Sequence, residues 1–318
     1  MLGNRFLSKI MTVYISGGGK RRRCVCRAFP VSILFAAALL LGGCSGEPGG
    51  AEPRAFTGVI LEVDGAKGEL KVEVESGADF LDEPRVWASA RPGDVANAKP
   101  GAKIRAFLAD AESGEAAYRL EQVWPAEEDS ERVVEHLNRR LREDTVLRGE
   151  GAYRMEGEAL PRFALYDQYG DLVRPERFKG NRVVVNFIFT RCMDPQMCPA
   201  ATERMRQLQK SADETGIEDF ELMSVTLDPD YDTPGVLRDY AENRGIDLEN
   251  YSFLTGPDRA VRDLMTQLGV LAHEDDEMYW VHTMTTLLVD SDGTILHRVD
   301  GSQWMVSDFL NRLKEEET

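Results

Sequence analysis

The sequence of 318 residues has few cysteines and a shortage of basic side chains, and both facts restrict what it can be. Lys and Arg number 38 against 55 Asp and Glu, so the formal net charge is −17. This balance argues against a nucleic-acid partner, because neutralising phosphates needs clustered Lys and Arg. The longest apolar run, Val31–Leu41, has eleven residues and is too short to span a bilayer comfortably.

The N-terminal segment has the layout of an export signal. Residues 1–43 carry seven Lys or Arg and no Asp or Glu, and the short apolar run fits the h-region of a signal peptide. The run ends in Leu41-Gly42-Gly43-Cys44, which resembles a bacterial lipobox. We therefore expect 1–43 to be a lipoprotein signal peptide and Cys44 to carry a lipid. An ordinary signal peptide or an uncleaved anchor is the alternative.

This leader also decides how the five cysteines are interpreted. Cys24 and Cys26 lie within it, and Cys44 is the lipid site, so the mature protein keeps one pair, Cys192 and Cys198. Lipidation predicts a place in the bacterial cell envelope, on the periplasmic or extracytoplasmic side. A lone pair in such an oxidising compartment is either a structural disulfide or a redox or metal-binding pair.

Two regions with different periodicities follow a tether over 44–54. Residues 55–125 contain short alternating apolar runs, such as Val59, Leu61 and Val63, with turn signals between them. This spacing predicts a small all-β, barrel-like domain. It has no His, Met or Cys between its first and last aromatic residues. We therefore expect no soft-metal ligation there and interpret it as a spacer or docking module.

The rest of the chain predicts an α/β layer fold. Charged residues with apolar positions at helical spacing indicate an amphipathic linker helix within 126–150. Over 151–318 strands and helices alternate, and the continuous apolar run 183–189 is typical of a central strand buried on both faces. We expect Thr233 to cap a helix that opens with Pro234, and residues 271–281 to form a loop.

The two remaining cysteines lie between the predicted central strand and a helix that begins near Pro199. At a helix N-terminus the dipole and the free backbone N–H groups favour thiolate. Thiolate is the form that attacks disulfides and binds soft metals. A purely structural disulfide is the alternative, although closing so short a loop gains little stability.

Residues from about 160 to 318 resemble the Sco/SenC family of copper-binding, thioredoxin-like proteins. Three segments carry the resemblance in order: Asn186–Cys192, Val225–Pro234, and Val281-His282-Thr283 followed by Leu287–Asp290. The resemblance implies a thioredoxin-like domain with copper ligands at Cys192, Cys198 and His282. Two thiolates and one imidazole suit Cu(I) in a trigonal site and can also hold Cu(II).

The sequence departs from the family pattern at two places. Five residues separate the cysteines where the family usually has three, and Val281 stands where it often has Asp. Met193 and Met197 in the longer loop either add a soft thioether contact or only fill the loop.

Several further side chains are weaker candidates. Asp228 and Asp232 could position the ligands or contact a partner, but capping and turn formation explain them nearly as well. His273 lies in an acidic stretch and could assist metal capture. We expect His136 and His297 to lie on the surface.

The resemblance implies a copper chaperone or assembly factor for the copper centre of a respiratory cytochrome c oxidase, with the copper-containing oxidase subunit as partner. The alternative is a thiol–disulfide oxidoreductase that keeps the cysteines of that subunit reduced, with Cys192 attacking and Cys198 resolving. A copper sensor or passive copper-binding lipoprotein is a third hypothesis. Delivery and reduction use the same thiol pair, so whether the protein is an enzyme stays open.

Overall fold

The computed structural model describes residues 52–77, 79–111, 116–270, 272–274, 280–301 and 304–314, with the main chain alone at 272–274 and 280–282. The predicted signal peptide and Cys44 lie outside these ranges. In the described part of the chain, none of the helices combines the length and the apolar character that crossing a membrane requires.

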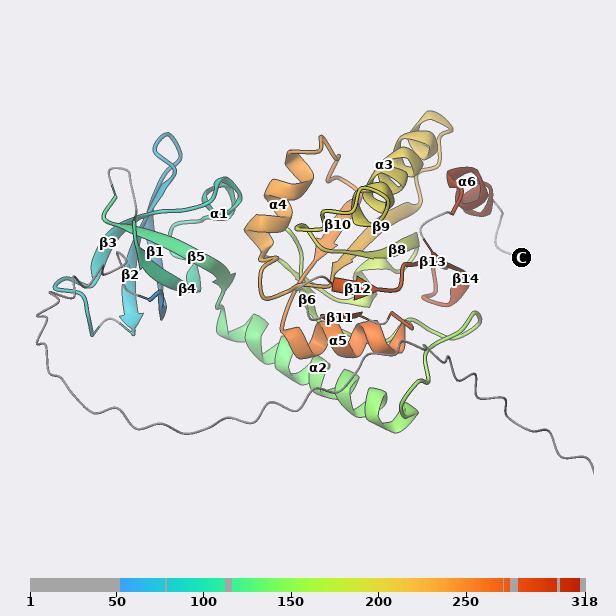
Figure 1. Ribbon diagram of the computed structural model, residues 1–318, viewed down its shortest axis with the longest axis horizontal. Coiled ribbons are helices and arrows are strands. Elements are labelled where there is room, and N and C mark those ends of the chain that lie inside the picture. Colours follow the sequence, from blue (N-terminus) through green and yellow to red (C-terminus); the bar gives the residue numbers. More distant parts are fainter. Residues whose placement is uncertain are drawn as a thin grey trace, which may run out of the picture. The chain divides into compact units, whose positions relative to one another are not determined.

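The first region forms a closed five-stranded barrel, as predicted. Its strands follow the order β1-β2-β3-β5-β4, and the short helix α1 connects β3 to β4 (Figure 1). The elements are β1 (Arg54–Asp64), β2 (Glu69–Ser76), β3 (Arg85–Ser89), α1 (Pro92–Asn97), β4 (Lys103–Asp110) and β5 (Tyr118–Pro125). Its core consists of aliphatic side chains and Phe56, which a small barrel needs in order to fill its interior.

The inward face of β1 differs from the face that the sequence alternation suggested. Phe56 and Ile60 are buried in the barrel, whereas Val63 is 36% exposed. Gly58 lies between the two buried residues, and a Cβ there would come within 2.3 Å of the Glu73 carbonyl oxygen. The close approach of β2 at Gly58, together with register shifts along β1, sets which side chains face inward.

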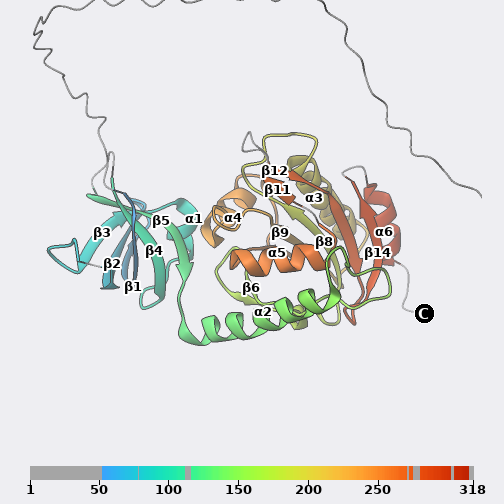
Figure 2. The same cartoon turned by 60° about the horizontal axis from the view of Figure 1, so that its bottom comes forward.

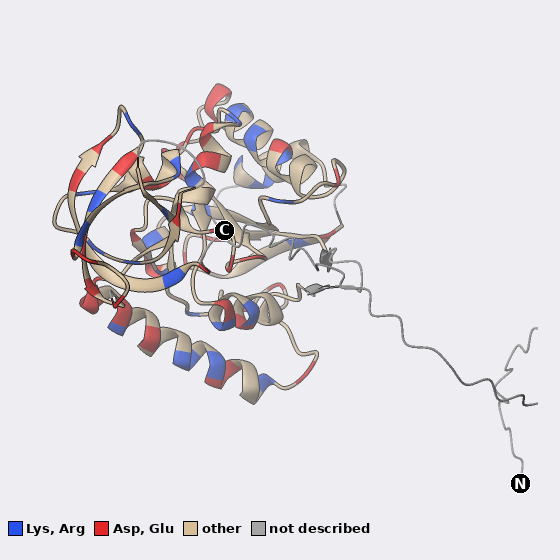
Figure 3. Cartoon of the chain, turned by 60° about the vertical axis from the view of Figure 1, so that its left-hand side comes forward, with Lys and Arg blue, Asp and Glu red and all other residues tan. Residues whose placement is uncertain are grey.

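Helix α2 (Glu128–Arg148) is the amphipathic linker helix expected after the barrel, and it also packs against the sheet region. It packs along α5 (Asp258–Gln267), where the Gln267 amide donates hydrogen bonds to the Leu141 carbonyl and the Thr145 hydroxyl at 3.2 and 3.0 Å. Acidic and basic residues alternate along its outer face (Figure 3), in ion pairs such as Arg132–Glu128. The helix is therefore part of the α/β layer.

The second region is built on a five-stranded sheet in the order β10-β9-β8-β13-β14. Strands β8, β9 and β10 are parallel, whereas β13 runs antiparallel to β8 and β14 antiparallel to β13. The strands are β8 (Arg182–Ile188), β9 (Phe220–Thr226), β10 (Tyr251–Leu254), β13 (Thr285–Val289) and β14 (Ile295–Asp300). A small hairpin of β6 (Leu165–Tyr166) and β7 (Leu172–Val173) and the 3-10 turn η1 (Pro175–Phe178) precede β8.

Helices cover both faces of this sheet. Helices α3 (Cys198–Glu214) and α6 (Val306–Lys314) lie on one face, and α5 and α2 lie on the other (Figures 1 and 2). Helix α4 (Pro234–Glu242) lies against β10. From Val183 onward β8 is fully buried, as its apolar sequence, interrupted at Asn186, predicted. The predicted α/β thioredoxin-like fold preceded by a small β-barrel is confirmed.

Two local predictions need correction. Thr233 occupies the cap position of α4, but its hydroxyl makes no capping hydrogen bond to the helix. The stretch expected to be a loop over 271–281 contains the paired strands β11 (Ala272–Glu274) and β12 (Trp280–His282). Each has only three residues, too few for an alternating pattern to show in the sequence.

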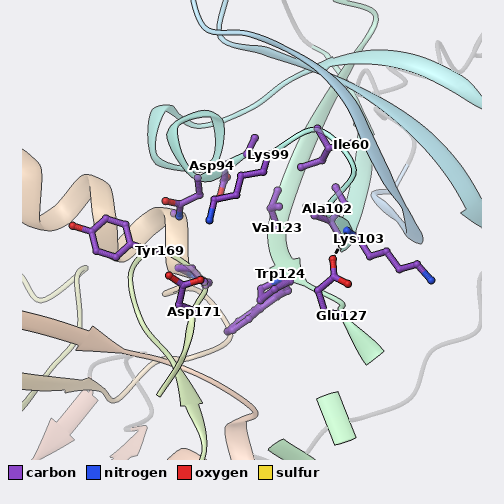
Figure 4. A pocket seen from close by; sticks show the side chains of 17 residues that line it. Ile60, Asp94, Lys99, Ala102, Lys103, Val123, Trp124, Glu127, Tyr169 and Asp171 are labelled. Atoms are coloured by element: carbon purple, nitrogen blue, oxygen red, sulfur yellow. Dashed lines mark hydrogen bonds between the residues drawn. The ribbon is translucent and has the colours of Figure 1, made fainter. Parts of the chain in front are cut away.

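The barrel contacts the sheet region where the N-terminal ends of α1 and α4 meet. A Cβ on Gly93 would lie 2.1 Å from the Gly235 carbonyl oxygen, so neither helix start has room for a larger residue. Beside this contact lies a cavity of about 220 Å³, lined by Asp94, Trp124 and Tyr169 among others (Figure 4). Asp94 is 4% exposed, and burial raises the pKa of its carboxyl to about 7.

Candidate metal centre

Both candidate cysteines carry free thiols at the junction of β8 and α3. Cys198 is the first residue of α3 and is completely buried, whereas Cys192 is half-buried in the preceding loop. That loop is held by its own hydrogen bonds. The amides of Gln196 and Met197 donate to the side chain and the carbonyl of Asp194 at 2.8 and 3.2 Å. The longer spacing between the cysteines is thus accommodated by an ordered turn.

The two thiols are electrostatically unequal. A hydrogen bond with Cys198 is the largest influence that lowers the pKa of Cys192, which falls to about 6. The same hydrogen bond, together with burial, raises the pKa of Cys198 well above its ordinary range. At neutral pH the pair therefore holds one proton, and the negative charge resides on the more accessible sulfur.

Asp232 holds the backbone just before Cys192. Its carboxylate is fully buried and accepts hydrogen bonds from the Thr190 N–H at 3.1 Å, from the Thr190 hydroxyl, and from the Thr226 hydroxyl at 2.5 Å. Burial raises the pKa of Asp232 to about 6, although these hydrogen bonds oppose the rise. Asp232 thus fixes where the loop leaves β8.

Asp228 holds the next residue, Arg191. Its Oδ2 accepts hydrogen bonds from Nε and Nη2 of Arg191 at 3.0 and 2.6 Å. The Arg191 guanidinium also lies over the ring of Tyr231, with Cζ 4.2 Å from the ring centroid. Both aspartates therefore anchor the residues that lead into Cys192, and neither hydrogen-bonds to the cysteine sulfurs among the contacts described.

Sequence reasoning missed Thr190, Arg191 and Tyr231 as parts of the site. All three lie in segments that carry the family resemblance. However, Thr190 and Arg191 find their partners 42 and 37 residues further along the chain. The sequence pattern around each residue contains no signal for such pairings.

The main chain brings His282 to the same edge of the sheet as the cysteines. His282 is the last residue of β12, and β13 begins three residues later at Thr285. Because β13 pairs antiparallel with β8, with Thr286 opposite Asn186, its first residue lies at the end of β8 that leads to Cys192. The side chain of His282 lies outside the described residues, so its ligand role stays a prediction.

The other candidate histidines and methionines are placed as follows. His136 is exposed on α2, as expected. His297 is more enclosed than expected: its side chain is 19% exposed, and its two ring nitrogens lie 3.3 and 3.4 Å from carboxylate oxygens of Glu156 and Asp308. Met193 is 87% exposed, which is inconsistent with filling the loop. His273 lies in β11, where the main chain alone is described.

No group of three or more His, Cys, Asp or Glu side chains forms a metal site within the part of the chain whose side chains are described. The two thiols nevertheless suit a soft metal ion. They are neighbouring sulfur donors, one is already acidic, and the turn around them is fixed.

Comparisons with known proteins show the family to which the chain belongs. The model of the SCO1/SenC family matches residues 152–316. A Stutzerimonas stutzeri protein named for copper binding is 31% identical over 163 residues, which are 48% of this chain and 78% of that protein.

Two solved structures are also similar to this chain. A SCO1/SenC family lipoprotein of Bacillus anthracis is 26% identical, with a TM-score of 0.47 over 51% of this chain and 98% of that chain. BsSco, described as a member of the Sco family of cytochrome c oxidase assembly proteins with a disulfide switch, is also 26% identical. Its TM-score is 0.45 over 51% of this chain and 96% of that chain.

Proposed function

Because the chain belongs to the SCO1/SenC family, we propose that it binds copper and delivers it to the copper centre of a cytochrome c oxidase. The Stutzerimonas stutzeri relative is named for copper binding, which supports copper as the bound ion. The Sco family is described as cytochrome c oxidase assembly proteins, which supports an oxidase as the recipient. The single observation that carries the proposal is the free thiol pair at the junction of β8 and α3, with its acidic, half-buried Cys192.

We propose Cys192, Cys198 and His282 as the copper ligands. Thiolate sulfurs are soft donors that favour Cu(I), and an imidazole nitrogen lets the same site hold Cu(II). Cys198 has no exposure to solvent, so an ion bound to its sulfur would be shielded from water on that side. Cys192 is accessible, so it is the ligand that a thiolate of the oxidase subunit could displace first.

A second function is favoured by the unequal acidity of the two thiols. As a thiol–disulfide oxidoreductase, the Cys192 thiolate would attack a disulfide of the oxidase subunit, form a mixed disulfide and release one partner thiolate. Cys198 would then lose its proton and attack the Cys192 sulfur, releasing the second partner thiol. The chain would end as the Cys192–Cys198 disulfide and the partner as a dithiol.

We further propose that residues 1–43 are removed and that Cys44 carries a lipid in the bacterial cell envelope, with the folded regions on the extracytoplasmic side. The support is the basic leader, the short apolar run and the lipobox-like end. Mass spectrometry of the mature chain tests this: an unmodified Cys44, or a mature start elsewhere, would contradict it.

Delivery and reduction can be separated by one experiment. The reduced protein is loaded with one equivalent of Cu(I) without oxygen and mixed with the metal-free copper domain of an oxidase subunit, offered either as dithiol or as disulfide. A chaperone transfers copper to the dithiol form. An oxidoreductase, without copper, reduces the disulfide form. Reduction without any copper transfer would replace the first function by the second.

A further inference from the structure

Two guanidinium groups from different regions of the chain lie against the ring of Tyr231. The Cζ of Arg191 lies 4.2 Å from the ring centroid, and the Cζ of Arg91 lies 5.4 Å from it. Arg191 directly precedes Cys192, whereas Arg91 belongs to the barrel region and directly precedes α1. The stack therefore connects the barrel to the thiol loop through one side chain.

The turn that carries Tyr231 is rigid. The amides of Tyr231 and Asp232 both donate to the Asp228 carbonyl, at 3.1 and 2.8 Å, and the Asp228 amide donates to the Thr226 hydroxyl at 3.0 Å. The aspartates of the same turn hold the two residues before Cys192. Tyr231 is thus connected to the cysteine loop both through its contact with Arg191 and through the hydrogen bonds of this turn.

Arg91 is fixed from the barrel side. It is the N-cap residue of α1, whose first residues touch the start of α4 with almost no space at Gly93 and Gly235. The Arg238 side chain of α4 donates to Asn97 at 2.8 Å, and Asn97 donates to the Gln168 carbonyl at 2.8 Å. Figure 4 shows Asp94, the third residue of α1, facing this junction.

We propose that the barrel is part of the thiol centre, with Arg91 and Tyr231 as positioning residues that hold Arg191 and hence the Cys192 loop in its dithiol conformation. This inference deepens the proposed function and rests on it only in taking the Cys192–Cys198 pair as the working centre. It replaces the interpretation of the barrel as a spacer, because a spacer would not need a contact with the turn that anchors the thiols.

The proposal is tested by the thiol–disulfide equilibrium of the metal-free protein, in a chain where Ser replaces Cys24, Cys26 and Cys44 so that Cys192 and Cys198 are the remaining thiols. In this equilibrium one protein dithiol and one oxidised glutathione give one protein disulfide and two reduced glutathione molecules. Arg91→Ala should favour the disulfide two- to fivefold, which is the size expected for one exposed cation–π contact. Tyr231→Ala removes both contacts with the ring and should favour the disulfide at least as much. Tyr231→Phe keeps the ring face and should stay near the wild type.

Two controls separate positioning from general destabilisation. Arg85→Ala removes another barrel arginine, which pairs with Glu73 at 2.9 Å on the surface, and should leave the equilibrium unchanged. Arg91→Ala should add nothing in a Tyr231→Ala background, because both substitutions break the same stack. An unchanged equilibrium in Tyr231→Ala, or an equal change in Arg85→Ala, would overturn the proposal. Copper plays no part in the assay, so failure of the copper-delivery function would not affect the result.

Discussion

At the scale of single residues, the two thiols of the candidate centre differ in both exposure and acidity. Cys198 is fully buried as the first residue of α3, and Cys192 is half-buried in the loop before it. Their shared hydrogen bond holds the negative charge on Cys192. This arrangement suits the first step of either proposed function, because a metal ion and a partner disulfide both meet Cys192 before Cys198.

The shared hydrogen bond predicts how each thiol responds to substitution. The pKa of Cys192 lies near 6, so its alkylation rate by iodoacetamide should rise through about pH 6 and level off above about pH 7. In Cys198→Ala the stabilising hydrogen bond is lost, and the midpoint should move to higher pH. With Ser in place of Cys24, Cys26 and Cys44, Cys192→Ala should show no fast reaction, because Cys198 is buried. An unchanged midpoint in Cys198→Ala would contradict this account of the thiol pair.

Asp232 is expected to matter for the stability of the loop. Asp232→Asn replaces one acceptor oxygen by an NH₂ group that faces the Thr190 and Thr226 donors, so we expect a loss of about 1–3 kcal/mol in the free energy of unfolding. Asp230→Asn is the matched control, since Asp230 lies in the same turn and is exposed. Urea unfolding at pH 7.5 measures both. Equal stability of the two variants would contradict the role assigned to Asp232.

At the scale of elements, the contact between α1 and α4 buries a carboxyl group. Asp94 is almost entirely enclosed, and none of the described residues donates a hydrogen bond to its Oδ2. Arg91 partly offsets the burial and Asp239 adds to it, so the pKa of Asp94 is about 7 in the folded state. The junction between barrel and sheet region is therefore sensitive to pH.

The direction in which pH changes stability follows from how many protons Asp94 binds in the folded and in the unfolded state. Between about pH 4 and pH 7 the folded state binds more protons at Asp94 than the unfolded state, so the free energy of unfolding falls as pH rises. The contribution is present below about pH 4 and is lost as pH rises through about 7, with an upper limit of about 4 kcal/mol. Asp94→Asn keeps the shape without titrating, and it should flatten this part of the profile.

Urea unfolding of the wild type and Asp94→Asn from pH 5 to pH 8 measures the difference. Asp82→Asn, which changes an exposed acid of the barrel region, is the control and should follow the wild type. Because Asp232 also titrates in this range, the comparison between variants isolates Asp94. Parallel profiles for the wild type and Asp94→Asn would show that Asp94 does not titrate as described.

The same elements show how far sequence can predict this fold. Strands and helices with strong periodicity, such as 183–189, lie where expected, because burial on both faces leaves a clear apolar run. The inward face of β1 was not predictable, since it depends on a close approach of β2 at Gly58. Thr233 illustrates a third case: the cap position was right, but the side-chain hydrogen bond does not form.

At the scale of the whole molecule, the candidate centre is assembled from distant parts of the chain. The cysteine loop follows β8, its anchors follow β9, and the main chain of His282 comes from the segment before β13. The family resemblance implied a set of candidate ligands, but it contained no information about Arg91, which contacts Tyr231 from the barrel. Contacts between regions far apart in the sequence leave no periodic signal in either region.

We propose that the chain holds copper through two sulfurs and one nitrogen. A paired anaerobic titration with Cu(I) and Cu(II) tests it most directly, using a chain in which Ser replaces Cys24, Cys26 and Cys44, and its Cys192→Ser, Cys198→Ser and His282→Ala variants. Each Cys→Ser change should reduce Cu(I) affinity by more than about 100-fold, beyond the effect typical of residues that only support a ligand. His282→Ala should weaken Cu(II) far more than Cu(I), since two thiolates alone can still hold Cu(I). If His282→Ala binds both ions like the wild type, the site is a dithiol alone, and the oxidoreductase function would replace copper delivery.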